Sequence, residues 1–277
     1  MKPDQHNVCL SFDFDSISLW MALGQSSPTP ISRGEFGAVA AARILKLLKK
    51  HDVVGTWFIP GVTLQTYPDI CAEINTQGHE IAHHGYTHIS PVTMSKVEEL
   101  DALKRGNDAI RKITGNYARG YRSPAWDLSQ HSIGLLIREG FLYDSSMMAH
   151  DHQPYFARQG DLLTEDRIQF GETSTLVEIP ISWSLDDFPH FEYFRGNGLM
   201  NAGLVLDNWL GDFEFMQTDT EWGVLTYTFH PFVIGRGHRM LMLERLILKL
   251  KANGANFITA EEAASVFRSR HANGQAC

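Results

Sequence analysis

Residues 79–88 read HEIAHHGYTH, and whether this stretch forms a helix or a strand decides the fold. Its first five residues match H-E-x-x-H, a zinc-binding pattern that needs both histidines on one face of a helix. The glycines at positions 78 and 85 leave too few residues between them for such a helix. In a strand, His79 and His83 share a face but stand about 13 Å apart at ~3.3 Å per residue, whereas a zinc ligand lies about 2 Å from its ion. We therefore predict a strand and interpret His79 and His83 as structural residues or as supports for neighbouring ligands.

The second pair of histidines, His84 and His88, falls where this strand ends. Gly85 allows the chain to turn, so that His88 comes round beside His84. Ligands collect at the C-terminal ends of strands in a parallel sheet, and this position favours a metal site. The H-x-x-x-H spacing alone is equally consistent with a chance pair of surface or packed histidines. A metal site therefore needs further ligands from other strand ends.

The first predicted strand, residues 8–12, runs into the acidic stretch SFDFD (11–15). Asp13 and Asp15 point to the same side of an extended chain, so both can face one site. Charges at the mouth of an apolar strand are costly unless they are paired, and the two histidines with a cation would pair them. Solvated acids at a turn or at a helix start are the alternative for this stretch taken alone.

Two further strand ends carry polar residues. YRSP (121–124) places Arg122 after one predicted strand, and FHP (229–231) places His230 after another. Each has a structural alternative, because Arg122 can serve as an ion-pair partner and His230 as a packed core histidine. Since acids, histidines and an arginine all follow strands, we predict that they form one site.

Strands and helices alternate along the chain, which predicts an α/β fold around a parallel sheet. The expected strands are residues 8–12, 53–59, 79–83, 118–121, 176–183, 224–229 and 256–259. The expected helices are residues 38–50, 68–77, 95–114, 129–139 and 241–251. At 277 residues the pattern favours a closed or nearly closed barrel in one domain, residues 1–277, with a flexible tail over 268–277.

Two stretches interrupt the alternation, and we expect both to be long loops: residues 149–174 and residues 184–223. The second stretch contains an aromatic group, Phe188, Phe191, Tyr193 and Phe194. These side chains would wall a pocket, stack on a substrate ring or pack at a subunit interface.

The composition is that of an ordinary globular protein, with 43% hydrophobic and 20% charged residues. A net charge of −8 argues against nucleic acid or an anionic membrane as the main partner. Three cysteines suit reduced thiols rather than a disulfide framework. The N-terminus has no apolar run of the signal-peptide type, and no stretch approaches the roughly 20 residues that span a bilayer. We expect a cytoplasmic protein that binds neither nucleic acid nor membrane.

Taken in order, these motifs resemble those of the polysaccharide deacetylases, the NodB-homology group of carbohydrate esterase family 4. SFDFD (11–15), HGYTH (84–88), RSP (122–124) and FHP (229–231) are similar to the four ordered motifs of that family, and YDSS (143–146) resembles a further feature. The resemblance covers nearly the whole chain. It implies a distorted (β/α)7 barrel of the NodB-homology type.

The resemblance also implies a metal-dependent hydrolase of non-peptide C–N bonds. Asp15, His84 and His88 would hold a divalent metal ion, with Zn2+ as the first choice. A His2Asp set leaves coordination positions open for water and a carbonyl oxygen. The implied substrate is an N-acetylated sugar, as an oligosaccharide or a small molecule, and the implied assembly is a homo-oligomer, commonly a tetramer.

The catalytic roles carried over from the family fall on the remaining motif residues. Asp13 would be the general base, oriented by Arg122, and His230 would be the general acid. The backbone N–H of Ala125 would join the oxyanion site, with Trp126 beside it at the substrate.

The chain departs from the family pattern in two places. Its first motif has a residue between the two acids and lacks the glycine, and the usual acid motif near the sixth strand is not evident. Asp187 and Asp144 are therefore candidate partners of His230. The D-x-D motif together with ISRGEF (31–36) and WSLDD (183–187) resembles a subgroup of peptidoglycan-deacetylase-like, allantoinase-like and cyclic-imide-hydrolase-like proteins.

Two alternative functions stay open. A cyclic imide or allantoin-type ureide would be opened by the same base, metal and acid. A deacetylase-like binding protein would keep the fold without the reaction, although binding alone would require neither Asp13 nor His230. The arginines at positions 236 and 239 would contact substrate or form ion pairs at a helix end, and we favour the ion pairs.

Overall fold

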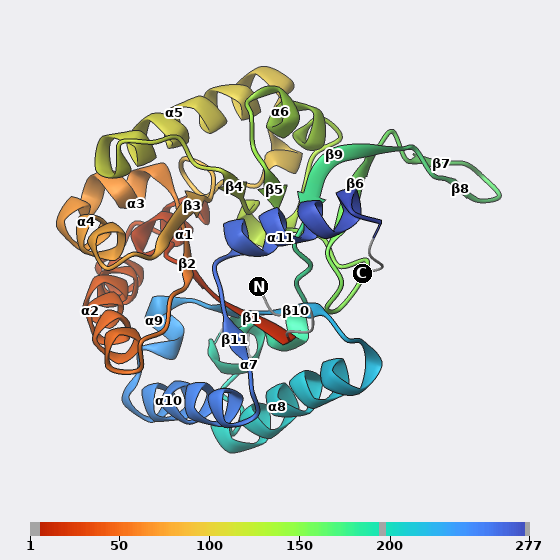
Figure 1. Cartoon of the computed structure of the whole chain (residues 1–277). Helices are drawn as coiled ribbons and strands as arrows, with labels where there is room; N and C mark the ends of the chain where they lie inside the picture. The colour runs from red at the N-terminus through yellow and green to blue at the C-terminus, as the bar shows by residue number, and fades with distance from the viewer. Residues whose placement is uncertain (1–5, 194–197, 275–277) are drawn as a thin grey trace.

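The computed structural model of the chain describes residues 6–193 and 198–274. A curled sheet forms its centre and helices surround it (Figure 1). The strands follow the order β10-β1-β2-β3-β4-β5-β9-β6, and β11 pairs with β1. All pairs from β10 through β9 are parallel and build a half-barrel, which confirms the α/β prediction and the barrel-type fold.

The strands of this sheet have between two and eight residues. They are β1 (His6–Asp13), β2 (Thr56–Ile59), β3 (Glu80–His83), β4 (Gly120–Tyr121), β5 (Tyr143–Asp144), β6 (Tyr155–Gln159), β9 (Glu172–Glu178), β10 (Gly223–Phe229) and β11 (Asn256–Phe257). β6 is antiparallel to β9. Between them, β7 (Leu162–Leu163) and β8 (Ile168–Gln169) form a hairpin that projects from the body (Figure 1).

The helices cover the outside of the sheet. They are α1 (Ile17–Ala22), α2 (Pro28–Lys50), α3 (Gly61–Thr66), α4 (Pro68–Thr76), α5 (Lys96–Thr114), α6 (Ser132–Arg138), α7 (Asp187–Phe191), α8 (Ala202–Asp219), α9 (Pro231–Ile234), α10 (Gly237–Ala252) and α11 (Ala260–Ala272). Short 3-10 turns occur at Pro91–Thr93, Pro124–Trp126 and Trp183–Leu185.

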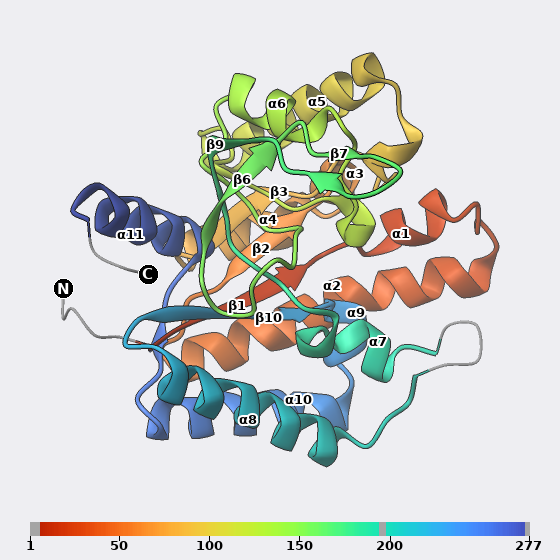
Figure 2. The ribbon, with the colours of Figure 1, turned by 90° about the vertical axis from the view of Figure 1, so that its right-hand side faces the viewer.

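The parallel strands all end on one side of the molecule. β1 and β10 run side by side, from His6 opposite Gly223 to Phe12 opposite Phe229. Figure 2 shows β1 pointing toward the side where α1 and α7 lie. The segments that follow the parallel strands therefore converge on this side, where parallel barrels carry their sites.

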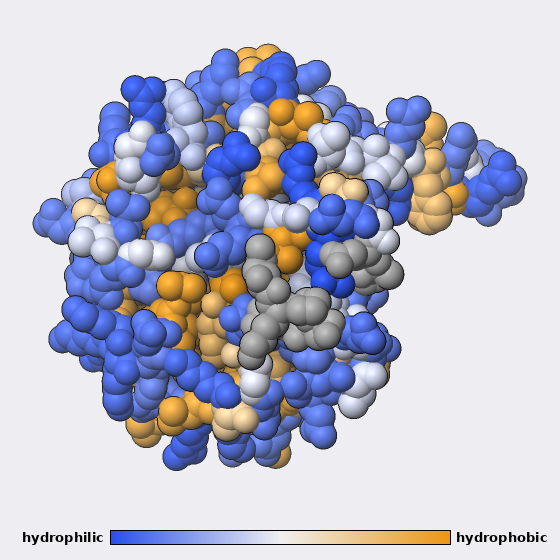
Figure 3. Space-filling model, viewed as in Figure 1, coloured by the Kyte–Doolittle hydropathy of each residue, from blue (hydrophilic) through white to orange (hydrophobic). Residues whose placement is uncertain are grey.

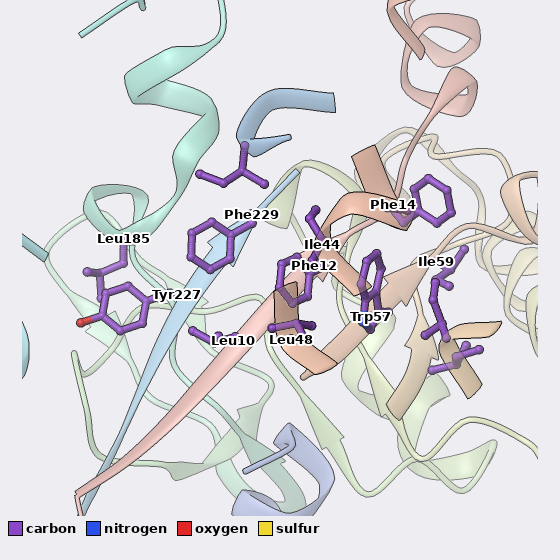
Figure 4. Packing of buried hydrophobic residues seen from close by; sticks show 14 of the residues in the cluster. Leu10, Phe12, Phe14, Ile44, Leu48, Trp57, Ile59, Leu185, Tyr227 and Phe229 are labelled. Carbon is purple, nitrogen blue, oxygen red and sulfur yellow. The ribbon is translucent and has the colours of Figure 1, made fainter. Parts of the chain in front are cut away.

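Aromatic side chains of adjacent strands build the core beneath this end. The ring of Phe12 lies 4.6 Å from that of Trp57 and 5.5 Å from that of Phe229, measured between centroids. Figure 4 shows Ile44 and Leu48 of α2 in the same packed group. Truncating one of these buried aromatics to alanine would cost about 3–5 kcal/mol of unfolding free energy.

The structure confirms the predicted strand that precedes His84 and both ends of the predicted helix 95–114. β3 is the strand predicted from HEIAHHGYTH. Helix α5 begins after Ser95, whose backbone N–H donates to the Glu98 carboxylate at 2.8 Å while Glu98 N–H donates back to the Ser95 hydroxyl. It ends at Gly115, which has a φ of 80° in the left-handed region.

The prediction of a long loop over residues 184–223 is wrong, because α8 occupies its second half. The side chain of Asn201 caps this helix by accepting from the N–H groups of Gly203 and Leu204. One face of the helix is buried through Val205, Leu206, Trp209, Phe213 and Met216. This spacing follows a helical period that the many other apolar residues of the stretch obscured.

Other boundaries also differ from the prediction, and strand β9 covers Glu172–Glu178 rather than 176–183. Helix α2 begins at Pro28, ten residues before the expected start, because proline suits a first helical position. The stretch 149–174 contains strands β6, β7 and β8 rather than a loop alone. Residues 268–272, predicted as part of a flexible tail, belong to α11, and residues 275–277 lie outside the described part.

Within the described part of the chain, no helix combines the length and the apolar character needed to cross a bilayer. The face seen in Figure 3 is largely polar, with apolar side chains on the projecting hairpin. Leu162 and Leu163 of that hairpin are 58% and 85% exposed. The homo-oligomer implied by the resemblance stays a prediction.

Candidate metal and catalytic site

The structure brings six of the residues singled out in the sequence together at the C-terminal ends of four strands. They are Asp13 at the end of β1, Asp15 just beyond it, His84 and His88 after β3, Arg122 after β4 and His230 after β10. Each is buried, with at most 8% of its surface exposed. Charged groups withdrawn from water in this way need partners of opposite charge or a metal.

Asp15, His84 and His88 form one of the groups able to hold a metal ion, with one ligand atom of each within 4.8 Å of the others. Asp15 Oδ1 lies 3.3 Å from His84 Nε2 and 3.4 Å from His88 Nε2. The Nδ1–H of His84 donates to the backbone carbonyl of Arg122 at 2.8 Å. This bond leaves the His84 Nε2 lone pair facing Asp15, the arrangement that metal-binding histidines adopt.

The protonation states of Asp15 and His88 suit a cation. Both carboxylate oxygens of Asp15 are buried and lack a hydrogen-bond partner in the described part of the chain. Burial alone would raise the pKa of Asp15, but His88 and His84 outweigh it and hold the pKa at about 2. Burial lowers the pKa of His88 to about 4, so its imidazole is neutral at pH 7. An ionised carboxylate and a neutral imidazole are the ligand forms that a divalent metal requires.

Backbone strain concentrates at this site. Six described residues other than glycine have positive φ, and four of them are Ser16, His88, Ala125 and Trp126. Each adjoins or belongs to the predicted site. Conformations of this kind cost about 1–3 kcal/mol apiece and cluster at functional sites.

The turn that brings His88 to the site depends on its neighbours. Gly85 has a φ of 70°, and a Cβ at this position would come within 2.9 Å of Pro124. Its N–H donates to Nδ1 of His83 at 3.0 Å, and the other nitrogen of that ring meets the Leu103 carbonyl at 3.0 Å. His83 therefore supports the ligand turn, and the prediction of a structural role for it is confirmed. His79 likewise accepts the Gly55 N–H at 3.3 Å.

Asp13 is held differently from Asp15, because both of its oxygens have donors. The Nη1–H of Arg122 donates to Asp13 Oδ1 at 2.7 Å, and the indole N–H of Trp126 donates to Oδ2 at 3.3 Å. Asp13 Oδ2 also lies 3.9 Å from His84 Nε2. The free oxygens of Asp15 and the occupied oxygens of Asp13 favour Asp15 as the metal ligand of the two.

Arg122 is itself fixed on every side. It donates to Ser11 Oγ at 2.9 Å, to the Ser145 carbonyl at 2.9 Å and to Ser145 Oγ at 2.9 Å. Its guanidinium carbon lies 4.0 Å from the ring centroid of Phe58. The contribution of Ser145 explains the YDSS stretch, whose role the sequence left unassigned. Because Nε, Nη1 and Nη2 each donate to a partner, the guanidinium is held in place and fixes the position of Asp13.

Trp126 was predicted beside the substrate, and the structure gives it a second contact. Its ring stacks on that of Trp183, with centroids 4.2 Å apart, and Trp183 is 47% exposed. Ala125 is exposed and has a φ of 58°. The hydrogen bond from the Trp126 indole to Asp13 was missed, since nothing in the sequence places these two residues side by side.

His230 has two carboxylate neighbours. Its Nδ1–H donates to Asp187 Oδ1 at 2.9 Å, and Asp186 Oδ1 lies 3.3 Å from the same nitrogen. Its Nε2 lies 3.8 Å from Asp15 Oδ2 and so faces the metal group. Burial would lower the pKa of His230, but Asp186 and Asp187 outweigh burial and raise the pKa well above its usual value. Of the two predicted partners, Asp187 is therefore the one that lies beside His230. Asp186, which was not predicted, is a second carboxylate neighbour of the same ring.

The other predicted partner, Asp144, lies elsewhere. It faces Glu178 across the β5–β9 pair and accepts from the Ser146 hydroxyl at 2.8 Å. Glu178 accepts from the N–H groups of Ser146 and Met147, each at 2.8 Å. Burial raises the pKa of Asp144 to about 6, and burial together with Asp144 raises that of Glu178 well above its usual value. The pair supports the turn that carries Ser145.

The aromatic residues of the second predicted loop lie in different surroundings. The ring of Phe188 lies 5.3 Å from that of His230 and borders the site. Phe191 is buried in the core, whereas Tyr193 is 60% exposed. Phe194 lies outside the described residues.

The expectation of helix-terminal ion pairs is wrong for Arg239, which donates to the carbonyls of Val233 at 3.0 Å and Phe191 at 2.9 Å. The guanidinium of Arg236 lies 3.6 Å above the ring centroid of Phe36. These contacts secure the chain around α9. They give neither arginine a place among the ligands of the candidate site.

Known proteins resemble this chain in both sequence and fold. Residues 27–141 match the family model described as polysaccharide deacetylase. The chain is 33% identical to a peptidoglycan deacetylase of Helicobacter pylori over 95% of its own length and 97% of that protein's. A crystal structure of a candidate polysaccharide deacetylase from Mycobacterium smegmatis is 30% identical, covers 97% of this chain and 92% of its own, and superposes with a TM-score of 0.86.

A structure of PuuE allantoinase has the same fold at 20% identity, with a TM-score of 0.79 over 99% of this chain and 93% of its own. That likeness concerns the fold alone. The agreement with the Helicobacter protein extends over nearly both complete chains. The chain belongs to the polysaccharide deacetylase family.

Proposed function

We propose that this chain is a metal-dependent hydrolase that removes acetyl groups from N-acetylated amino sugars of the peptidoglycan type. One observation carries the proposal. The buried Asp15 carboxylate, with no hydrogen-bond partner in the described chain, faces two imidazoles, between a clamped Asp13 on one side and His230 on the other. Such an arrangement supplies a metal site, a base and an acid around one point.

The donor set fits a divalent cation such as Zn2+. Asp15, His84 and His88 would hold it through one carboxylate oxygen and two imidazole nitrogens. When bound, such a cation acidifies a water molecule and polarises the amide oxygen of the substrate. Because the His84 Nδ1–H is committed to a backbone carbonyl, the ring keeps the tautomer that metal binding needs.

Asp13 would take the proton of the attacking water. Its two hydrogen bonds, from Arg122 and Trp126, hold the carboxylate in one orientation beside His84. A base held in this way is already oriented toward the water and need not reorient during the attack. The exposed Ala125 would direct its backbone N–H to the oxyanion as negative charge develops on the amide oxygen.

His230 would protonate the leaving amine. The leaving nitrogen is too basic to depart as an amide anion. His230 must therefore be protonated at the moment of C–N cleavage, so that it can donate a proton to this nitrogen. Asp187 and Asp186 keep the His230 ring protonated and leave Nε2–H as the donor toward the reaction centre. The products are a carboxylate and a free amine.

Two observations support a sugar substrate. The relative that is 33% identical is a peptidoglycan deacetylase. The half-exposed Trp183 stacks on Trp126, which donates to Asp13, and this pair offers an aromatic face next to the base. Sugar rings present apolar faces that pack on such indoles.

Acetate release tests the proposal. Zinc-loaded protein should release acetate from N-acetylglucosamine oligomers and from N-acetylated peptidoglycan fragments, and the Asp13→Asn variant should not. Allantoin and cyclic imides serve as the comparison substrates. Ring opening of these compounds without acetate release from any sugar would overturn the sugar assignment and leave the same residues with a different substrate.

A further inference from the structure

A second group of metal-ligand side chains lies in the loop between β5 and β6. It consists of His150, Asp151 and His152, and one ligand atom of each lies within 4.8 Å of the others. The loop meets the start of β10, where the Val224 N–H donates to the His152 carbonyl at 2.9 Å. Val224 and His230 are six residues apart on one extended segment, so the group lies roughly 20 Å from the catalytic site.

The ring of His152 has a fixed tautomer. It is buried, with 1% exposure, and its Nε2–H donates to Asp219 Oδ2 at 3.0 Å. A neutral imidazole that donates through Nε2 carries a lone pair on Nδ1. This Nδ1 lies 3.2 Å from Asp151 Oδ1, which is also an acceptor.

The ring of His150 meets the same oxygen. Its Nδ1 accepts from the backbone N–H groups of His152 at 3.2 Å and Gln153 at 3.1 Å, so this nitrogen also carries a lone pair. It nevertheless lies 2.9 Å from Asp151 Oδ1. The backbone N–H of His152 also donates to Asp151 Oδ1, at 3.1 Å. Each of the two ring nitrogens still lies within 3.2 Å of this carboxylate oxygen, and such a contact between acceptors needs a proton or a cation between them.

We propose that His150, Asp151 and His152 form a second binding site for a divalent transition-metal ion of the zinc type. Ligands about 2.0–2.1 Å from a tetrahedral zinc ion stand roughly 3.3 Å apart, close to the two contacts of Asp151. Two imidazoles and one carboxylate are donors that suit zinc or nickel better than calcium.

The surroundings match those of bound metals elsewhere. Asp219 accepts from the second nitrogen of His152, as carboxylates do behind metal-binding histidines. A small cavity of about 40 Å³ adjoins the group, and Asp151 and Asp212 both line it. The side chains of His150 and Asp151 are 42% and 59% exposed, so an ion can enter from solvent and keep water as its fourth ligand. His150 Nδ1 accepts two amide N–H groups at 3.1 and 3.2 Å, and this exposed ring would have to rotate to turn its lone pair to the ion.

A bound ion would join three parts of the fold. His150 and Asp151 belong to the loop before β6, Asp219 ends α8, and His152 is bonded to β10. The site is therefore structural, and its occupancy should stabilise the chain without changing the rate of the reaction.

Counting zinc ions by equilibrium dialysis tests the proposal. We expect two Zn2+ per wild-type chain, one in Asp15→Ala, one in His150→Ala and none in the double variant. His238→Ala removes another exposed histidine and should still bind two. One ion in wild type with none in Asp15→Ala would overturn the second site, as would full zinc content in His150→Ala. Because the two single variants report separately, failure at one site is distinguishable from failure at the other.

Thermal unfolding in the Asp15→Ala background gives an independent readout. Added Zn2+ should raise Tm in this variant and leave the double variant with His150→Ala unchanged, because only a folded chain presents the site. Asp219→Asn should weaken zinc binding about 10–100-fold, the usual loss when a carboxylate behind a metal-binding histidine is replaced. If a proton alone separates the three lone pairs, Zn2+ will leave the Tm of Asp15→Ala unchanged, and the proposal fails.

Discussion

Asp13 and Asp15 are two residues apart, yet they have different surroundings. Asp13 accepts hydrogen bonds from Arg122 and Trp126, which lie 109 and 113 positions away in the sequence. Among the residues that the structure describes, the side chains that face the Asp15 carboxylate are histidine rings. The alternation of a strand predicted that both carboxylates face one site. Which of them receives donors depends on distant residues, and no local pattern could assign it.

The hydrogen bond from Trp126 to Asp13 can be removed without removing the ring. Trp126→Phe retains the stack on Trp183 but loses the indole N–H. A hydrogen bond to a charged group contributes about 1.5–3 kcal/mol, so kcat should fall about tenfold or more while zinc content stays unchanged. Steady-state kinetics with zinc analysis measures both. Trp183→Phe is the matched control and should leave kcat nearly intact, whereas an equal loss in both variants would assign the effect to stacking.

The pH profile should report the charge of Asp187. His230 must be protonated to act as an acid, so activity is present below its pKa and is lost as pH rises through it. Asp187→Asn keeps an oxygen for both hydrogen bonds from His230 but removes a charge that raises this pKa. The alkaline limb of kcat should move to lower pH by on the order of one pH unit. An unmoved alkaline limb would remove His230 from the role of acid.

Among the helices and strands, short apolar strands followed by glycine or proline could be predicted from the sequence. Strands β6, β7 and β8 could not. An apolar, β-branched run predicts the strand at Val224–Phe229. The glycines at positions 78 and 85 favour a strand over a helix for the HEIAHH stretch between them. β6, β7 and β8 lie in a polar stretch, and β6 is stabilised by its pairing with β9. Helix α11 carries a capping box of Thr259 and Glu262, a signal present in the sequence but unused.

Helix α2 packs closely against the backbone that follows Asp15, the proposed metal ligand. A Cβ on Gly34 would meet backbone atoms of Ile17 at 2.7 Å and Ser16 at 2.8 Å, whereas a Cβ on Gly37 meets its neighbours at 3.4 Å or more. Gly34→Ala should therefore destabilise the chain by about 1–3 kcal/mol and weaken zinc binding. Gly37→Ala is the control and should retain both. Urea unfolding with zinc titration measures them, and equal behaviour of the two variants would refute this role of the contact.

At the scale of the whole molecule, the sheet joins the two ends of the sequence. β1 lies between β10 and β2, so residues more than 200 positions apart become neighbours. The alternation of strands and helices indicated a parallel barrel, and the order of the motifs indicated the family. Strand order and the identity of His230's partner depend on this long-range pairing, which no window of sequence contains.

The stability of the whole chain should depend on pH through the buried pair Asp144 and Glu178. Both have a raised pKa, so the folded chain binds more protons than the unfolded chain and stability falls as pH rises above about 4. Glu178→Gln keeps an oxygen for the N–H groups of Ser146 and Met147 but does not ionise. It should be more stable than wild type at pH 8, by on the order of 1–2 kcal/mol.

Urea unfolding from pH 5 to pH 8 measures this difference. Glu172→Gln changes an exposed residue of the same strand and should follow the wild-type curve. A Glu178→Gln variant with the full wild-type pH dependence would show that the pair does not hold its proton.

We propose that Asp15 holds the metal and that Asp13 takes the proton of the attacking water. Zinc content and acetate release from N-acetylglucosamine oligomers, measured on the same preparations of Asp15→Ala and Asp13→Asn, test it most directly. We expect Asp15→Ala to lose the catalytic zinc ion together with acetate release. Asp13→Asn should keep wild-type zinc content and lose turnover by at least about 100-fold. Full zinc content in Asp15→Ala, or near-normal acetate release by Asp13→Asn, would contradict these two roles.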